Sequence, residues 1–159
     1  MDGFLVPRGF FVTSGEAHDG ASELNAFDLA LKDAGITECN LVEVSSILPP
    51  GSQELEPVEI PKGAITFCVM AKMAGTLGER VGCGLAWTWG TIDTGERYGI
   101  VAEHHSNAPA TEVERMLNVK LSRMAEVRGM DIEEPKTCVR SMVCEGNYGC
   151  VVAVLVYVP

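Results

Sequence analysis

Two adjacent serines, Ser45 and Ser46, have the clearest potential for chemistry in this sequence. They follow an alternating, β-branched run that begins at Leu41, and two consecutive prolines come shortly after them, at Pro49 and Pro50. Consecutive prolines fix φ and remove two backbone donors, so a strand that carries the serines must end there. A serine hydroxyl is a weak nucleophile unless geometry or a base activates it, and a strained strand end can supply that geometry. The pair is therefore a candidate nucleophilic site, although a strand ending in a polar loop is the commoner meaning of two serines.

Glu103 is a candidate general acid. It ends the apolar run that starts at Ile100, where burial would raise the pKa of its carboxyl group and keep a proton available. A solvated glutamate at a strand end is the alternative. His104 and His105 follow, but adjacent residues of a strand point to opposite faces and cannot easily bind one ion. No metal site is therefore expected.

The composition is that of an acidic globular protein. The 159 residues are enough for one domain, with 47% hydrophobic and 21% charged residues. The net charge of −10 argues against a nucleic-acid partner, which needs a Lys/Arg surplus, and it suits a cationic substrate. Neither a signal-peptide pattern nor a bilayer-spanning run is apparent, so we expect a cytoplasmic protein with no membrane partner. The six cysteines contain no Cys-x-x-Cys pair and are expected to be buried free thiols.

Two helices are expected. The first begins at Ser22 and stops at Gly35, because its apolar residues recur at helical spacing. Asp28 lies at the edge of that apolar stripe and either reaches a neighbouring cavity or faces water. The second helix opens with a capping box at Thr111–Glu114 and ends near Gly129. Its predicted core face comprises Val113, Met116, Leu117, Leu121, Met124 and Ala125.

Strands are expected wherever apolar or β-branched residues run together. The predicted strands are Phe4–Ser14, Asn40–Leu48, Ala64–Met73, Val81–Trp89, Tyr98–His105, Thr137–Cys144 and Cys150–Tyr157. The predicted connections are a polar loop at Ser14–Ala21, a non-periodic loop at Gly51–Lys62, and turns at Gly75, Gly78, Gly90 and Gly95. The last two strands are expected to run antiparallel around Glu145–Asn147. Strands that outnumber two helices indicate an α+β protein with stacked sheets and helices outside.

Several short motifs, in this order, resemble the pyruvoyl-dependent arginine decarboxylases. They are Asn25–Asp28, Asn40–Leu41, Ser45–Pro50 and Pro61–Ala64. The resemblance runs from about Pro7 to the end of the chain. It implies one domain over residues 1–159, folded as a four-layer αββα sandwich with two outer helices. It also implies active sites at the interfaces of a homotrimer or of a dimer of trimers.

The resemblance implies self-cleavage between Ser45 and Ser46. Ser46 would attack the carbonyl of Ser45, and elimination would then separate residues 1–45 (β chain) from residues 46–159 (α chain). Residue 46 would become a covalent pyruvoyl group that forms a Schiff base with arginine, giving agmatine and carbon dioxide. Decarboxylation needs such an electron sink. PLP is the other possible source, but Lys62 and Lys72 have no phosphate-binding glycine loop near them.

The resemblance also assigns roles to four further residues. Asn40 would assist processing, with a structural hydrogen bond at the strand start as its alternative role. Glu103 would protonate the α-carbon of the substrate. Asp28 would pair with the guanidinium, and Leu24 would line the aliphatic part of the pocket.

Two other functions stay open. One is a pyruvoyl decarboxylase of another amino acid, such as histidine, because Trp87 and Trp89 are bulkier than the residues this strand has in the family. The other is an unprocessed, non-catalytic trimeric module whose acidic pocket binds a cationic metabolite. The state of the Ser45–Ser46 bond separates this module from the enzymes.

Overall fold

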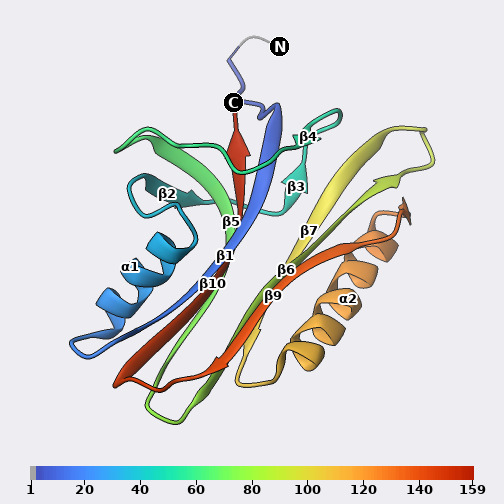
Figure 1. The fold of residues 1–159 in the computed structure, drawn as a ribbon. Coiled ribbons are helices and arrows are strands. Elements are labelled where there is room, and N and C mark those ends of the chain that lie inside the picture. The colour runs from blue at the N-terminus through green and yellow to red at the C-terminus, as the bar shows by residue number, and fades with distance from the viewer. Residues whose placement is uncertain (1–2) are drawn as a thin grey trace.

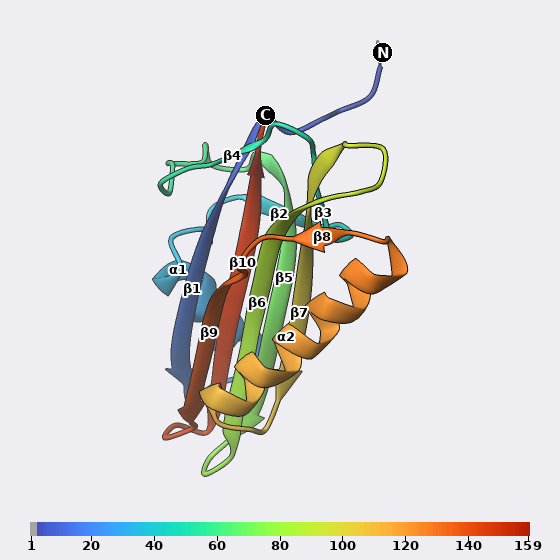
Figure 2. The same ribbon diagram turned by 90° about the vertical axis from the view of Figure 1, so that its right-hand side faces the viewer.

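The computed structural model describes residues 3–159, which form two helices and ten strands in two five-stranded sheets (Figures 1 and 2). The helices are α1 (Glu23–Asp33) and α2 (Ala110–Val127). The first sheet, here sheet A, has the order β2 (Asn40–Glu43), β5 (Ile65–Thr76), β10 (Tyr148–Val158), β1 (Gly9–Asp19) and β4 (Gln53–Glu54). Sheet B has the order β3 (Ile47–Leu48), β7 (Arg97–Ser106), β6 (Arg80–Thr91) and β8 (Asp131–Ile132), with β9 (Lys136–Val143) also paired to β6. The chain is therefore an α+β protein, as expected.

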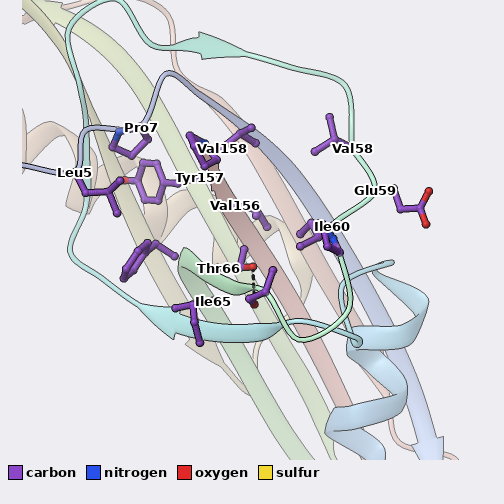
Figure 3. A pocket seen from close by; sticks show the side chains of 14 residues that line it. Leu5, Pro7, Val58, Glu59, Ile60, Ile65, Thr66, Val156, Tyr157 and Val158 are labelled. Carbon is purple, nitrogen blue, oxygen red and sulfur yellow. Dashed lines mark hydrogen bonds between the residues drawn. The ribbon is translucent and has the colours of Figure 1, made fainter.

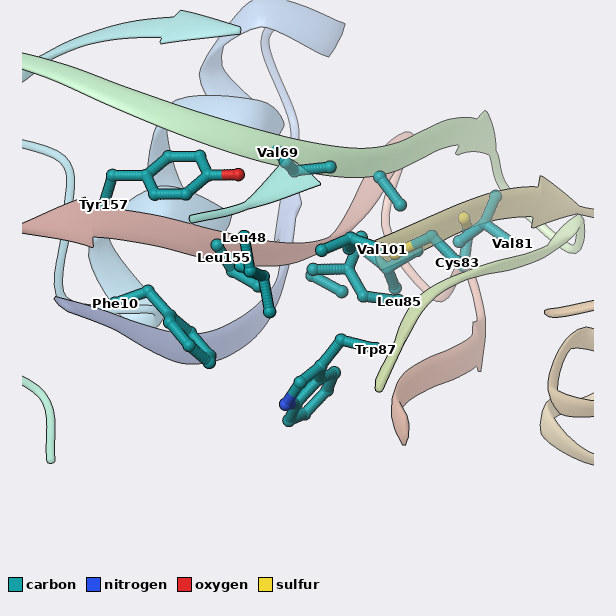
Figure 4. Close-up of a cluster of buried hydrophobic side chains, with 14 residues drawn as sticks. Phe10, Leu48, Val69, Val81, Cys83, Leu85, Trp87, Val101, Leu155 and Tyr157 are labelled. Atoms are coloured by element: carbon teal, nitrogen blue, oxygen red, sulfur yellow. The ribbon is translucent and has the colours of Figure 1, made fainter. Parts of the chain in front are cut away.

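Buried apolar side chains gather in three clusters. One lies between the sheets, and Figure 4 shows Phe10, Leu48 and Leu85 within it. A second joins α1 to sheet A, and a third joins α2 to sheet B. Along β10, residues 151, 153, 155 and 157 belong to the first cluster and residues 152, 154 and 156 to the second. The long apolar run of β10 is thus explained by burial of both its faces.

Helix α1 has the predicted ends and packs unusually close to β1. The Ser22 side chain accepts a hydrogen bond of 3.0 Å from the Asn25 amide, which caps the helix, and Gly35 takes a positive φ of 79° just after it. A Cβ placed on Gly15 of β1 would lie 2.2 Å from the Ala30 carbonyl oxygen. Glycine at position 15 therefore allows α1 to lie against the sheet.

The prediction for the first strand was wrong at both ends. The strand does not span Phe4–Ser14 but Gly9–Asp19, and the expected loop at Ser14–Ala21 is mostly strand. Residues 14–19 are mostly polar and include Gly15, but they pair with residues 148–153 of β10. Tertiary pairing overrides local composition here.

The prediction of one strand over Asn40–Leu48 was also wrong. Strand β2 ends at Glu43 and pairs with β5 in sheet A, whereas β3 begins at Ile47 and pairs with β7 in sheet B. The chain therefore passes from one sheet to the other at Val44–Ser46. An alternating pattern cannot reveal this passage, because the pattern does not say which strands pair.

Helix α2 does not have the predicted capping box. The helix begins at Ala110 with Pro109 as its N-cap, and no side chain caps it. Glu114, the acidic residue of the predicted box, instead accepts a hydrogen bond of 3.2 Å from the Thr137 hydroxyl. The predicted core face is otherwise correct, because Val113, Leu117, Leu121 and Ala125 are buried and the two methionines partly so.

The glycine turns and the final hairpin were predicted only in part. Gly78 and Gly95 have positive φ and lie in turns, whereas Gly75 and Gly90 lie inside β5 and β6. The last two strands are not paired to each other: β9 pairs with β6, and β10 lies between β5 and β1. A short turn therefore joins two sheets rather than two neighbouring strands. No helix within residues 3–159 is long and apolar enough to cross a membrane.

Candidate active site

The serine pair lies where the chain crosses between the sheets. On the sheet A side, the Val44 amide donates a hydrogen bond of 2.9 Å to the Cys68 carbonyl. On the sheet B side, the Val101 amide donates one of 2.9 Å to the Ser46 carbonyl. Within residues 3–159, the peptide group that joins Ser45 to Ser46 makes no hydrogen bond. It is thus held on both sides while its own carbonyl stays free.

A pocket of about 510 Å³ opens beside this crossing. Ser45 and Ser46 line this pocket together with Glu103 of β7 and with Lys120 and Arg123 of α2. The structure therefore brings together three of the predicted site residues: Ser45, the candidate nucleophile Ser46 and the candidate acid Glu103.

The surroundings of Glu103 shift the pKa of its carboxyl group upward. Partial burial raises its pKa, and the Glu43 carboxylate raises it further, whereas Lys120 and His105 oppose the shift. The Lys120 ammonium also donates a hydrogen bond of 3.1 Å to the Glu103 carbonyl oxygen. Although much of Glu103 is accessible in the single protomer, the direction of the shift is the one expected from the sequence. A group of this kind can donate a proton above the ordinary range of a carboxylic acid.

Asn40 does not contact the serines. Its side-chain amide donates a hydrogen bond of 2.9 Å to the Gly63 carbonyl, and its backbone amide donates one of 2.8 Å to the Ala64 carbonyl. These bonds tie the start of β2 to the chain before β5. The structural role foreseen for Asn40 is therefore present, and a role in processing stays a prediction.

Asp28 and Leu24 lie outside the pocket of Ser46. Asp28 is exposed on α1, where the Thr37 hydroxyl donates a hydrogen bond of 3.0 Å to its carboxylate. Leu24 is 74% exposed and borders a second pocket of about 610 Å³, together with Lys72 and His105. Within one protomer, the two predicted substrate contacts are thus separated from the two predicted catalytic residues.

The tryptophans lie away from the pocket of Ser46. Trp87 belongs to the cluster between the sheets (Figure 4). Its indole N–H donates a hydrogen bond of 3.4 Å to the Glu54 carboxylate. Trp89 packs against Phe10, with ring centroids 6.4 Å apart, and the Arg97 guanidinium lies over its ring. Their bulk therefore fills the core and does not narrow the candidate site.

A third pocket, of about 260 Å³, has an almost wholly apolar lining (Figure 3). Leu5, Ile60, Ile65 and Tyr157 contribute to it, and Glu59 is its one ionisable side chain apart from the tyrosine. This pocket contains none of the residues predicted for the catalytic site. The pocket of Ser46, which holds Ser45, Ser46 and Glu103, is therefore the candidate active site.

Sequence reasoning missed three charged residues near the serines. Lys120 and Arg123 line the pocket, and Glu43 acts on Glu103 from the end of β2. The two cations recur three residues apart on α2, which places them on one side of that helix. The sequence does not show that this side faces the serine crossing, because that depends on how α2 packs on sheet B.

The structure thus has two sheets, and one pocket contains both the serine pair and a carboxyl group with a raised pKa. Comparison with known families points to the same kind of protein. Residues 9–159 match the family described as "Pyruvoyl-dependent arginine decarboxylase (PvlArgDC)", and the chain belongs to this family. The resemblance noted from the motifs is thereby confirmed.

Curated relatives cover nearly the whole chain. A pyruvoyl-dependent arginine decarboxylase of Methanopyrus kandleri is 37% identical over 153 residues, covering 96% of this chain and 97% of the relative. One of Methanothermobacter thermautotrophicus is 37% identical over 125 residues, covering 77% and 79%. One of Methanocella arvoryzae is 31% identical over 169 residues, covering 97% of each.

Membership of this family implies a covalently bound pyruvoyl group, and the residues around position 46 fit one. Ser46 has the hydroxyl and backbone from which such a group can be made. Its carbonyl is held by the Val101 amide, and the adjoining pocket is large enough for an amino-acid substrate.

Proposed function

We propose that the chain is a pyruvoyl-dependent arginine decarboxylase that converts L-arginine to agmatine and carbon dioxide. One observation carries this proposal. The peptide group between Ser45 and Ser46 makes no hydrogen bond within residues 3–159, and both serines line the same pocket as Glu103. Family membership supports the same reaction, since the relatives carry that name. The net charge of −10 suits a cationic substrate.

The single domain of residues 1–159 would first cleave itself. Ser46 Oγ attacks the Ser45 carbonyl carbon, its proton passes to the amide nitrogen, and the peptide bond becomes an ester. Loss of the Ser46 α-proton and breakage of the Cβ–O bond release chain 1–45 with a carboxylate on Ser45. Residue 46 then takes up water and loses ammonia, which leaves the pyruvoyl group at the start of chain 46–159. The hydrogen bonds of Val44 and Val101 support this step, because they hold the backbone on both sides of the reacting bond.

The pyruvoyl group supplies the electron sink for the electrons of the carbon–carbon bond that breaks. Glu103 would then protonate the α-carbon, as its raised pKa and its place beside Ser46 support. Lys120 would position this acid through its hydrogen bond to the Glu103 carbonyl.

A neighbouring protomer would complete the site in a homotrimer or a dimer of trimers. Asp28 and Leu24 of one protomer would reach the Ser46 pocket of the next, where Asp28 pairs with the guanidinium and Leu24 packs on the aliphatic chain. Their separation from Ser46 within one protomer supports this arrangement. So does the apolar surface beside the serines, where Val42, Val44 and Ile47 are 38%, 41% and 40% exposed.

The layers of the fold would be α1, sheet A, sheet B and α2, a four-layer αββα sandwich. The three apolar clusters, one between each pair of successive layers, support this order. A cytoplasmic location is proposed as well. It is consistent with six free cysteines within residues 3–159.

A substrate panel tests the proposed reaction. Protein cleaved at Ser46 is assayed for carbon dioxide release from arginine, histidine, ornithine, lysine and the neutral isostere citrulline. We expect arginine to have the highest kcat/KM, and Asp28→Asn to lower kcat/KM for arginine far more than for citrulline. Truncating one partner of a buried charge pair costs on the order of 2–5 kcal/mol. Equal losses for arginine and citrulline would remove Asp28 from guanidinium recognition, and preference for another amino acid would contradict the proposed substrate.

A further inference from the structure

The hydroxyl of Tyr157 contacts the backbone immediately after the serine pair. Tyr157 lies near the end of β10, where it pairs with Phe10 of β1, and only 8% of it is exposed. Its hydroxyl donates a hydrogen bond of 2.7 Å to the Ile47 carbonyl oxygen. The ring belongs to the apolar cluster between the sheets (Figure 4). A side chain of sheet A thus holds the first residue of sheet B after the crossing.

This hydrogen bond adds an anchor where the backbone has few others. Strand β3 comprises only Ile47 and Leu48, and its one neighbour in the sheet is β7. So short a strand is held weakly by its ladder alone. The Val101 amide holds the Ser46 carbonyl and Tyr157 holds the next carbonyl, so two consecutive carbonyls are fixed from two different sheets.

The surroundings keep Tyr157 a hydrogen-bond donor. Burial raises the pKa of its hydroxyl to about 12, so the group stays protonated near neutral pH. Tyr157 also lines a cavity of about 450 Å³ together with Val44, Ser45 and Ile47. This cavity shares Val44 and Ser45 with the pocket that holds Glu103, but Tyr157 lines only the former of the two.

We infer that Tyr157 is a positioning residue for self-cleavage, which holds the backbone from residue 46 onward during and after the attack by Ser46. The inference rests on the proposed cleavage between Ser45 and Ser46. Attack requires Ser46 Oγ to stay in near-attack contact with the Ser45 carbonyl carbon, and small misplacements lower such rates. Elimination then requires the Cα–H and Cβ–O bonds of Ser46 to stay aligned. Fixing the Ile47 carbonyl limits rotation of the chain that bears both bonds.

A looser backbone would change the product as well as the rate. Water can attack the ester carbonyl before elimination, which breaks the ester bond and releases chain 1–45 with a carboxylate. Residue 46 then keeps both its amine and its hydroxyl, and no ammonia is lost. The share of chain 46–159 that begins with serine rather than pyruvoyl therefore reports how well the backbone is held.

The test follows cleavage by intact mass in protein made by cell-free translation, so that the uncleaved chain is observed from synthesis onward. We expect Tyr157→Phe to cleave about 3- to 10-fold more slowly than wild type, the range for one neutral hydrogen bond, and to yield more serine-terminated chain. Tyr148→Phe is the matched control, since Tyr148 lies on the same strand and its hydroxyl makes no hydrogen bond within residues 3–159. It is expected to keep the wild-type rate and product.

A second control separates positioning from general loss of stability. Val154 is buried on the face of β10 that packs against α1, so Val154→Ala should lower the Tm without touching the Ile47 carbonyl. We expect its share of serine-terminated chain to equal that of wild type. The inference would be overturned if Tyr157→Phe gave the same share of serine-terminated chain as wild type. It would also be overturned if Val154→Ala raised that share as much as Tyr157→Phe does. A wild-type chain that never cleaves would contradict the proposed self-cleavage itself, and the inference with it.

A fluorinated tyrosine at position 157 tests the same role if Tyr157→Phe does not fold. Ring fluorination keeps the shape of the side chain and lowers the pKa of its hydroxyl. Because a phenolate cannot donate, cleavage should slow with rising pH at lower pH values than in wild type. An unchanged pH profile would overturn the inference.

Discussion

Glu103 shares a pocket with Ser46, which makes it the residue most directly open to test as the proton donor. Glu103→Gln keeps the shape of the side chain and removes its proton, so the two chains should still form while kcat for arginine falls by about 10²–10⁴-fold. Glu96→Gln, at an exposed glutamate outside this pocket, is the control and should keep full activity. Near-normal turnover in fully cleaved Glu103→Gln would remove Glu103 from the mechanism.

The pH dependence of turnover should report the pKa of Glu103. An acid works only while protonated, so kcat should fall as pH rises through this pKa, which partial burial and Glu43 raise above the usual carboxyl value. Glu43→Gln removes the neighbouring negative charge and lowers this pKa, so the falling limb should move to lower pH. The measurement is the pH profile of kcat in both proteins. A limb that stays in place, or moves to higher pH, would contradict the assignment.

At the scale of elements, the contact between β1 and α1 depends on the absence of a side chain at Gly15. Gly15→Ala would place a methyl group against the Ala30 carbonyl, and overpacking of this kind costs about 1–3 kcal/mol. Gly20→Ala, where an added Cβ meets nothing within 4 Å, is the matched control and should change the free energy of unfolding little. Urea unfolding measures both. Equal stabilities for the two variants would show that α1 does not approach β1 this closely.

The sequence predicted the elements whose signals are local and missed those defined by pairing. The strands β5, β6, β7 and β10 come from apolar runs, and the Ser22 cap and Gly35 stop of α1 follow from local chemistry. The polar half of β1 was missed because its partner β10 is more than 120 residues away. The break after Glu43 was missed because the alternating pattern does not show that β2 pairs with β5 while β3 pairs with β7.

The candidate site was predictable to a similar degree. Ser46 and Glu103 were found from their positions after apolar runs together with the family resemblance, and the structure places both in one pocket, with Glu103 inside β7 rather than at its end. The sequence did not predict the parts played by Lys120, Glu43 and Tyr157. Their contacts near the serines depend on how α2, β2 and β10 pack together. Asp28 and Leu24 came from the family motif alone, and their distance from this pocket in one protomer was not apparent from the sequence.

At the scale of the whole molecule, the proposed site is shared between protomers. An oligomer that contains both Asp28→Asn and Glu103→Gln chains would have some interfaces where an intact Asp28 meets an intact Glu103. Co-expression of the two weakly active variants should therefore restore part of the arginine decarboxylase activity. Activity that equals the average of the two variants expressed separately would show that each site is built within one protomer.

The proposed reaction requires self-cleavage of the Ser45–Ser46 bond, where the chain crosses between the two sheets. Intact mass spectrometry of the purified protein tests this most directly. We predict two chains, one of residues 1–45 ending in a free carboxylate and one of residues 46–159 starting with a pyruvoyl group, and a single uncleaved chain for Ser46→Ala. One mass for the whole chain after prolonged incubation of the folded wild-type protein would contradict the account.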